Sequence, residues 1–481
     1  MKHPLLWLFS LGYLLIFFLK LDSIPMIAMD EGWNAFYAYD EFLDNPYSLG
    51  TTIQYKLFFF YYILLAGWMK LFGISLFVVR SLNVVLGLAG LIGLYQLFKQ
   101  ITQNKLIITA GLLTFLMTNI VVVTFRWGRP EGMVLVLLVW ALFFLVKAVQ
   151  NNQPKQLFWG GLLLGLMVFT HPYSILVVLA IFLVLWRLPL TTLLSYRYLI
   201  YGGSIVVSII LIKGLIFDLD YLQTHFFDHI SQRLIFSGST NLLDSFIYFW
   251  QSYTLGVKRL YILIFEIGIL IIGVFKYRKD ALISNLSWMG LLTFMIGLVL
   301  LNPFRRRYMG IVMIFSVITS ILMIARKKTV FKKFIITVLM IYFSNNVLGN
   351  AYYIYKQIKN TSYAEITNQL QTKIPKGSKI MAPIQFWIAL HPFYTITDIH
   401  DQIGADAILN KLNQVDYIVS SPFFLKNVSP TTGGDAIGYD LSKNSFHNTL
   451  IKVTQSHSWI KQKKIIATPY DTISIYKQER K

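Results

Sequence analysis

Residues 29 to 41 are Met29-Asp30-Glu31-Gly32-Trp33-Asn34-Ala35-Phe36-Tyr37-Ala38-Tyr39-Asp40-Glu41, an acidic and aromatic segment that directly follows a hydrophobic run. Acidic residues are scarce here: only 22 of the 481 residues are Asp or Glu, and six of them lie between Asp22 and Asp44. The chain is 56% hydrophobic and only 14% charged, whereas about a quarter of the residues in a soluble protein are charged. The sequence therefore predicts a membrane protein with this acidic segment in an aqueous loop.

Repeated apolar runs of about 15 to 24 residues fit helices that cross a hydrocarbon core of roughly 30 Å. The first run has the length of a signal peptide, but no small-residue cleavage site follows it and many more runs do. We therefore predict an all-α polytopic membrane bundle of about eleven transmembrane helices. They fall near residues 5–20, 76–98, 106–124, 132–148, 157–170, 173–187, 198–217, 260–275, 281–301, 309–325 and 334–350.

Much of the net charge of +21 comes from basic residues in alternate short loops. This pattern indicates cytoplasmic loops of a membrane protein and not a nucleic-acid-binding surface. This pattern predicts a multi-pass protein of the cell membrane with a cytoplasmic N-terminus and an extracytoplasmic C-terminus. The chain has no cysteine, which excludes disulfides and thiolate metal sites. The loops concerned carry Lys99/Lys105, Lys147/Lys155, Arg187/Arg197, Lys276/Arg278/Lys279 and Arg326 to Lys333.

Two long external loops are predicted within the membrane domain of residues 1–350, at residues 21–75 and 218–258. Residues 57–72 are hydrophobic but short, and counting them as a span would invert every later basic loop. We therefore expect an interfacial or re-entrant helix there.

After residue 350 the composition becomes that of a soluble domain. Short strands are predicted at residues 379–382, 417–421 and 472–476, and a helix at residues 405–412. Residues 351–481 are thus predicted to form a small extracytoplasmic α/β domain.

The positions of chemical interest are charges at the outer face, where an external basic cluster requires an anion such as a phosphate. A carboxylate among such cations stays ionised and can take a proton from an incoming hydroxyl or amine. No Gly-rich phosphate loop or nucleotide fingerprint is present, which argues against a nucleotide-sugar donor. The charges and neighbouring polar residues are Asp30, Glu31, Lys56, Arg126, Arg129, Glu131, His171, Arg305, Arg306, Arg307 and Tyr308.

The order of several short motifs resembles the C-type, multi-spanning glycosyltransferases (GT-C fold) that include protein O-mannosyltransferases and the aminoarabinose transferase of lipid A. The resemblance covers most of residues 1–350. Its motifs are Asp30-Glu31, Lys56-Leu57-Phe58-Phe59-Phe60-Tyr61-Tyr62, Arg129-Pro130-Glu131, Thr170-His171-Pro172 and Arg307-Tyr308.

The resemblance implies an inverting transfer of a sugar from a polyprenyl-phosphate-linked donor at the extracytoplasmic face, with no cofactor required and no nucleic-acid partner. Asp30 would be the catalytic base, and Glu131, where relatives often have Asp, would bind acceptor or sugar. Lys56 would contact the lipid phosphate, although Leu57 stands where relatives usually have Pro. The helix at residues 57–72 would match the family's outer jaw helices.

We further predict that Arg129 and Arg305 to Arg307 bind the donor phosphate. Glu31, His171 and Tyr308 are candidate substrate-binding residues. Structural alternatives stay open for these residues. Asp30, Glu31 and Glu131 can each stabilise a helix N-terminus, and the three arginines can hold a helix end at the interface. No metal site is predicted. The acid between His225 and His229 is Asp228 rather than the Glu of a His-Glu-x-x-His motif. The Asp-x-Asp spacing of Asp218 and Asp220 can bind a divalent ion, but it is a common triplet.

A transporter or flippase of lipid-linked sugars is the alternative function, since it would also use many spans and intramembrane charge. The acceptor of a transferase is open: a lipid, a glycan or a protein hydroxyl.

Overall fold

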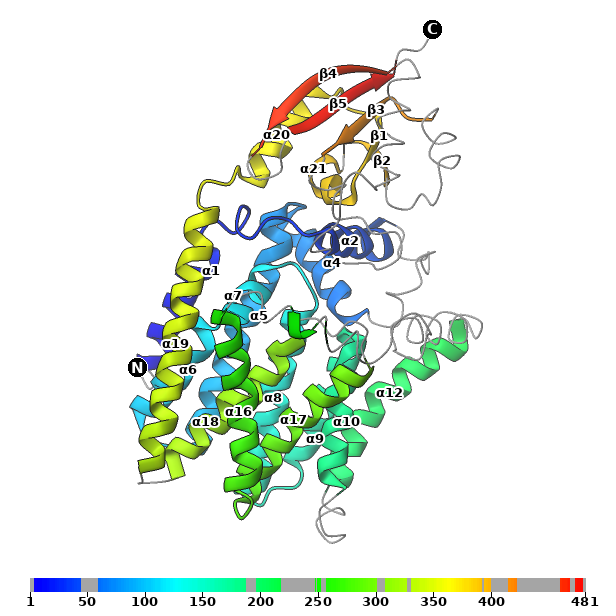
Figure 1. Ribbon diagram of the computed structural model, residues 1–481. Helices are drawn as coiled ribbons and strands as arrows, with labels where there is room; N and C mark the ends of the chain where they lie inside the picture. Colours follow the sequence, from blue (N-terminus) through cyan, green and yellow to red (C-terminus); the bar gives the residue numbers. More distant parts are fainter. Residues whose placement is uncertain are drawn as a thin grey trace.

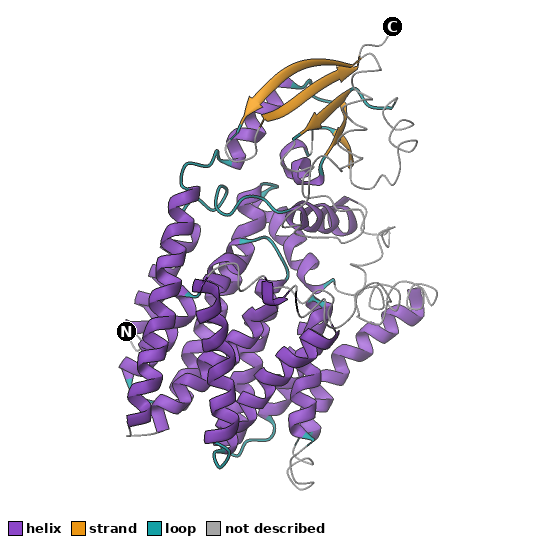
Figure 2. Cartoon of the chain, viewed as in Figure 1, coloured by secondary structure: helices purple, strands orange, loops and turns teal. Residues whose placement is uncertain are grey.

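The computed structural model describes residues 4–44, 59–186, 196–217, 247, 249–251, 257–300, 308–326, 330–391, 393–398, 414–421, 459–467 and 472–478. A helical bundle forms one tier of the molecule and a small sheet with short helices forms the other (Figures 1 and 2). Helices α2 and α4 lie between the two tiers (Figure 1). The acidic segment of α2 is therefore placed at the junction of bundle and sheet domain.

The bundle is built from apolar helices whose bounds follow the predicted runs closely. Helix α18 lies at its centre, with every residue from Met309 to Ile324 buried. The helices are α1 (Pro4–Phe18), α2 (Met29–Tyr39), the π-helix η1 (Asp40–Asp44), α4 (Phe60–Phe72), α5 (Leu76–Ile101), α6 (Lys105–Met117), α7 (Asn119–Arg126), α8 (Glu131–Gln150), α9 (Gln156–Thr170), the 3-10 helix η2 (Pro172–Ser174), α10 (Ile175–Leu185), α12 (Arg197–Phe217), α16 (Val257–Lys276), α17 (Ala281–Leu300), α18 (Met309–Arg326) and α19 (Val330–Gln357).

Five of the described helices are long and apolar enough to cross a membrane, or six if the bent pair α6 and α7 counts as one span. Several others, including α4, α9 and α10, are apolar but shorter. The chain is thus a multi-pass membrane protein, while the number of eleven spans stays a prediction.

The predicted span near residues 106–124 is two helices, α6 and α7, bent by 59° at a break. Polar side chains of α19 satisfy the backbone there: Asn346 Oδ1 accepts from the Asn119 N–H at 2.8 Å, and Asn350 Nδ2 donates to the Met117 carbonyl at 2.6 Å. Asn119 and Asn350 also join through their side chains at 2.8 Å. Because an unsatisfied backbone group in lipid is costly, these partners are what permits the break.

Glu266, in the apolar middle of α16, is also held by α19. It is 1% exposed, and the Tyr342 hydroxyl donates to its Oε1 at 3.0 Å. The partner of this intramembrane acid is therefore a tyrosine facing the bundle interior.

The second tier contains a five-stranded sheet of order β2-β1-β3-β5-β4. Strand β1 is parallel to β2 and β3, whereas β5 is antiparallel to β3 and β4. The three predicted strands are present as β1, β3 and β5, but the predicted helix at 405–412 lies outside the described residues. The elements are α20 (Tyr363–Lys373), β1 (Lys379–Ala382), the 3-10 helix η6 (Ile384–Phe386), α21 (Trp387–Leu390), β2 (Thr395–Asp398), β3 (Tyr417–Ser420), β4 (Trp459–Ile466) and β5 (Thr472–Gln478).

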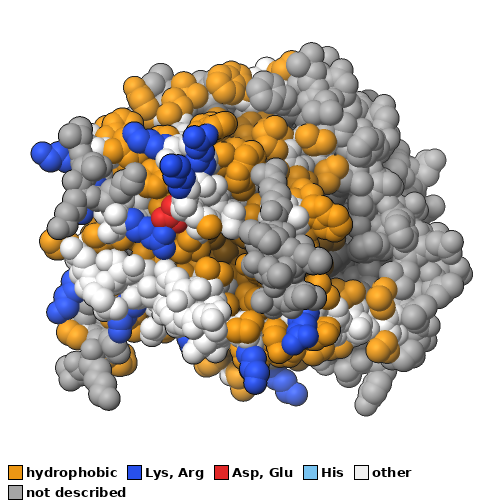
Figure 3. Space-filling view, turned by 90° about the horizontal axis from the view of Figure 1, so that it is seen from below, with side chains coloured by type: hydrophobic (Ala, Val, Ile, Leu, Met, Phe, Trp, Pro, Cys, Tyr) orange, Lys and Arg blue, Asp and Glu red, His pale blue; other side chains and the backbone are white. Residues whose placement is uncertain are grey.

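The bundle end far from α2 carries basic side chains. The turn between α16 and α17 lies there (Figure 1), with Lys276, Arg278 and Lys279 exposed. The view of this face shows Lys and Arg side chains among hydrophobic ones (Figure 3). Asp280 is ion-paired with Arg326. Basic loops therefore gather at the opposite end from the acidic segment.

Candidate active site

Helix α2 presents its two acids in different directions. The helix begins at Met29, so that Asp30 lies in its first turn rather than at the capping position, which Ala28 occupies. The Asp30 side chain is 37% exposed, while that of Glu31 is fully buried. The two neighbouring carboxylates therefore belong to two separate clusters.

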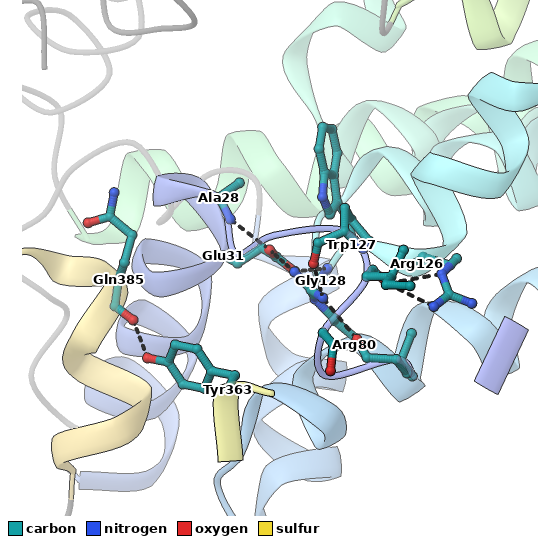
Figure 4. A network of polar contacts seen from close by, with 12 residues as sticks. Ala28, Glu31, Arg80, Arg126, Trp127, Gly128, Tyr363 and Gln385 are labelled. Carbon is teal, nitrogen blue, oxygen red and sulfur yellow. Dashed lines mark hydrogen bonds and ion pairs between the residues drawn. The ribbon is translucent and has the colours of Figure 1, made fainter. Parts of the chain in front are cut away.

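The first cluster is a closed ion pair between Glu31 and Arg80 of α5 (Figure 4). Arg80 Nε and Nη2 donate to the two Glu31 oxygens, each at 2.7 Å. The backbone N–H groups of Ala28 and Gly128 add hydrogen bonds of 2.9 and 2.8 Å to the same carboxylate. Glu31 thus ties α2 to α5 and to the loop before α8. Its predicted contact with substrate stays a prediction.

Arg80 also uses its remaining donors. Its Nη1 donates to the carbonyls of Leu21 and Pro25, at 2.8 and 2.6 Å. The sequence reasoning missed this residue, although a lone charge in the apolar run of α5 is the signal that could have found it. Such a charge is costly in a membrane unless it is paired, and here the pairing is complete.

The loop between α7 and α8, residues 127–130, is held by polar side chains from α2 and α5. Asn34 of α2 donates to the Gly128 carbonyl at 3.0 Å, and Asn83 of α5 donates to the carbonyls of Trp127 and, at 2.6 Å, Arg129. Gly128 packs tightly, because a Cβ there would come within 2.4 Å of Val79. These contacts therefore fix residues 127–129 of the loop.

Arg126 precedes this loop, and its guanidinium donates hydrogen bonds at the C-terminal end of α1. It is buried and donates to the carbonyls of Ile16, Phe17 and Leu19 at the end of α1, at 2.9, 3.0 and 2.6 Å. Cations near a helix C-terminus are favourable because the last carbonyls lack intrahelical partners. Among the described residues, the Arg126 guanidinium is thus bound by backbone carbonyls.

The second cluster is open and joins Asp30, Arg129 and Glu131. Arg129 Nη2 lies 2.6 Å from Asp30 Oδ2 and 2.7 Å from Glu131 Oε1, and its Nε donates to Glu131 Oε2 at 3.2 Å. The side chains of Arg129 and Glu131 are only 8% and 5% exposed, against 37% for Asp30. The structure therefore brings both predicted catalytic acids together around an arginine predicted to bind phosphate.

Tyr61 of α4 lies against this cluster and is fully buried. Burial raises the pKa of Tyr61 well above its ordinary value, and the nearby carboxylates of Glu31 and Glu131 raise it further. The phenol therefore stays protonated beside the acids.

His171 and Tyr308, both predicted to bind substrate, lie near one another. His171 Nδ1 accepts from the Tyr173 N–H at 3.3 Å, as a helix-end residue does. The Tyr173 ring contacts both in tilted arrangements, with centroids 4.4 Å from His171 and 4.6 Å from Tyr308. The other predicted phosphate ligands, Lys56 and Arg305 to Arg307, lie outside the described residues, as do His225, His229, Asp218 and Asp220. Within the described part of the chain, no group of three or more His, Asp or Glu side chains could hold a metal ion.

The sheet domain packs directly on α2. A Cβ on Gly32 would lie 2.5 Å from the Ile384 carbonyl oxygen, so only glycine permits this approach of η6. Trp387 of α21 contacts Phe36 and Tyr39, with ring centroids 5.7 Å apart in both pairs. Helix α2 is thus held by α5 on one side and by the second tier on the other.

Comparisons with known proteins agree with this architecture. Residues 58–216 match the family model of dolichyl-phosphate-mannose-protein mannosyltransferases. The crystal structure of ArnT from Cupriavidus metallidurans bound to undecaprenyl phosphate is similar with a TM-score of 0.61 at 12% identity, over 99% of this chain and 98% of ArnT. No curated protein matches the sequence.

Two further solved structures share the fold. The mycobacterial arabinofuranosyltransferase AftD is similar with a TM-score of 0.56 at 12% identity, over 100% of this chain but 42% of AftD. The oligosaccharyltransferase AglB from Archaeoglobus fulgidus, in complex with an inhibitory peptide and a dolichol-phosphate, has a TM-score of 0.50 at 11% identity, over 97% of this chain and 80% of AglB. The chain is therefore a polytopic membrane protein of the GT-C glycosyltransferase fold.

Proposed function

We propose that this protein transfers a sugar from a polyprenyl-phosphate-linked donor to an acceptor at the extracytoplasmic face of the membrane. The observation that carries the proposal is the open cluster, in which the partly exposed carboxylate of Asp30 lies 2.6 Å from Arg129 and Arg129 in turn binds Glu131. The fold supports the same conclusion, since ArnT was solved with undecaprenyl phosphate and AglB with a dolichol-phosphate.

Asp30 acts as the base in this proposal. The Arg129 guanidinium favours the charged form of the carboxylate, which then accepts the proton of an acceptor hydroxyl or amine. The acceptor atom attacks the anomeric carbon from the side opposite the phosphate, so that the configuration inverts. The bond between the anomeric carbon and the phosphate oxygen breaks, and its electron pair leaves with the polyprenyl phosphate.

The other residues have supporting roles in the proposal. Glu131 accepts a hydrogen bond from the sugar or the acceptor, while His171 and Tyr308 line the substrate path. Lys56 and Arg305 to Arg307 stabilise the departing phosphate, for which fixed positive charge is the main requirement. Glu31 is assigned a structural role, because its carboxylate already accepts four hydrogen bonds.

The test is release of undecaprenyl phosphate by membranes that contain the protein. The donors are undecaprenyl phosphate carrying mannose, glucose or aminoarabinose. We expect Asp30→Asn to lower the rate by at least about 100-fold, the usual scale for a lost general base. Asp22→Asn, in the loop before α2, is the matched control and should keep the wild-type rate.

Full activity of the Asp30→Asn protein would refute the assignment of the base. Movement of the intact donor across the membrane with no release of undecaprenyl phosphate would instead identify a flippase.

A further inference from the structure

Trp127 carries a buried hydrogen-bond donor that has no acceptor among the described residues. In the described part of the chain, its indole N–H is buried and meets no acceptor. By contrast, Trp68 donates to Ser81 Oγ at 2.9 Å and Trp140 donates to the Ala89 carbonyl at 3.1 Å. Leaving a buried donor without an acceptor is unfavourable, so a ligand that supplies an acceptor would be favourable here.

The Trp127 indole N–H belongs to the loop that carries Arg129 of the open cluster. The Arg129 guanidinium lies 5.4 Å from the centroid of the Trp127 ring, and the same guanidinium binds Asp30 and Glu131. The Trp127 carbonyl accepts from Asn83, which fixes the main chain below the ring. In Figure 4 the indole projects away from the network of Glu31 and Arg80. The ring is therefore held beside the proposed catalytic acids.

The charge of this cluster decides which ligand group fits it. Two carboxylates and one guanidinium sum to −1, which disfavours an anionic phosphate. Carboxylates accept hydrogen bonds from hydroxyl groups and an indole N–H donates one. Together they suit a neutral group that both donates and accepts, and a sugar carries such hydroxyls.

We infer that Trp127 binds the sugar of the donor, with its indole N–H donating to a sugar oxygen. This inference rests on the proposed function. It adds to that function a residue that recognises the sugar of the donor but not the phosphate. The phosphate is left to basic residues elsewhere in the chain.

The test is Trp127→Phe, which keeps an aromatic ring and removes the N–H. For the glycosylated donor that the wild type uses best, we expect KM to rise about fivefold to tenfold, the scale of one lost hydrogen bond. Binding of undecaprenyl phosphate without sugar, measured on the purified protein, should not change. The melting temperature should not fall either, because no hydrogen bond within the fold is lost.

Trp68→Phe and Trp140→Phe are the matched controls. Each removes an indole N–H that already has a partner, so each should lower the melting temperature and leave the donor KM unchanged.

An unchanged donor KM in the Trp127→Phe protein would overturn the inference. Equal weakening for undecaprenyl phosphate with and without sugar would overturn it too, since the contact would then be to the phosphate. If Asp30→Asn is inactive while Trp127→Phe behaves as wild type, only this inference fails. A wild-type protein that releases undecaprenyl phosphate from none of the donors would refute both proposals.

Discussion

Two acid–arginine clusters lie side by side in this molecule, and they begin at adjacent residues of one helix. Glu31 and Arg80 form a pair whose side chains are both 0% exposed, with each partner saturated by backbone groups as well. Asp30, Arg129 and Glu131 form a cluster with one partly exposed carboxylate. The same residue types therefore form a buried ion pair that holds helices together on one side of α2. On the other side they form a partly exposed cluster that a ligand can reach. What separates the two roles is accessibility to a ligand.

Removing Glu31 tests the closed cluster most severely. We expect Glu31→Ala to destabilise the protein by about 3–5 kcal/mol, because it leaves the Arg80 charge buried without its partner. The measurement is the melting temperature of the purified protein. Asp30→Ala is the matched variant in the neighbouring cluster and should change stability far less. A Glu31→Ala protein that melts like the wild type would remove the distinction between the two clusters.

Glu131 tests the open cluster. Glu131→Gln keeps the shape of the side chain but loses the charge that Arg129 binds. We expect the rate of donor cleavage to fall about 10-fold to 100-fold, the scale of a lost hydrogen bond to a charged group, with a smaller loss of stability than in Glu31→Ala. If the loss of activity merely follows the loss of folded protein, Glu131 is structural like Glu31.

The two arginines allow a matched exchange. Arg80→Lys would leave several hydrogen bonds unmade, at about 1.5–3 kcal/mol for each bond to a charged group. Arg129→Lys keeps a cation between two carboxylates, one of them partly exposed, and should cost less stability. The ratio of folded protein recovered from each variant reports the difference. Equal losses would mean that both clusters serve the fold alone.

Gly32 tests the opposite side of α2. A valine there would overlap the Ile384 carbonyl, and overpacking of this kind typically costs about 1–3 kcal/mol. We expect Gly32→Val to loosen the sheet domain from α2, which limited proteolysis of the purified protein would detect as faster cleavage. Gly67→Val in α4 is the control, since nothing lies within 4 Å of a Cβ there. Identical cleavage of the two variants would show that the domain does not depend on this contact.

The predictable parts of the structure are those that depend on local sequence. Apolar runs in the sequence predicted helices α5, α8 and α18. Alternating apolar residues predicted strands β1 and β5. The break at Thr118 could not be predicted in this way, because it depends on Asn350, which lies 231 positions from Asn119 in the chain. Arg80 was missed for a related reason: its partner Glu31 comes from another helix, 49 residues away.

The sequence by itself determined that this is a membrane protein, and it marked Asp30, Arg129 and Glu131 as the residues to watch. The first conclusion depends on composition. The second depends on charges that are costly in lipid, together with the order of the motifs that resemble the GT-C glycosyltransferases. Only the tertiary structure decided that Glu31 is buried against Arg80 while Asp30 stays partly exposed, and that the Trp127 N–H meets no acceptor among the described residues. Burial and pairing depend on residues that are distant in the sequence, so the local pattern could not assign them.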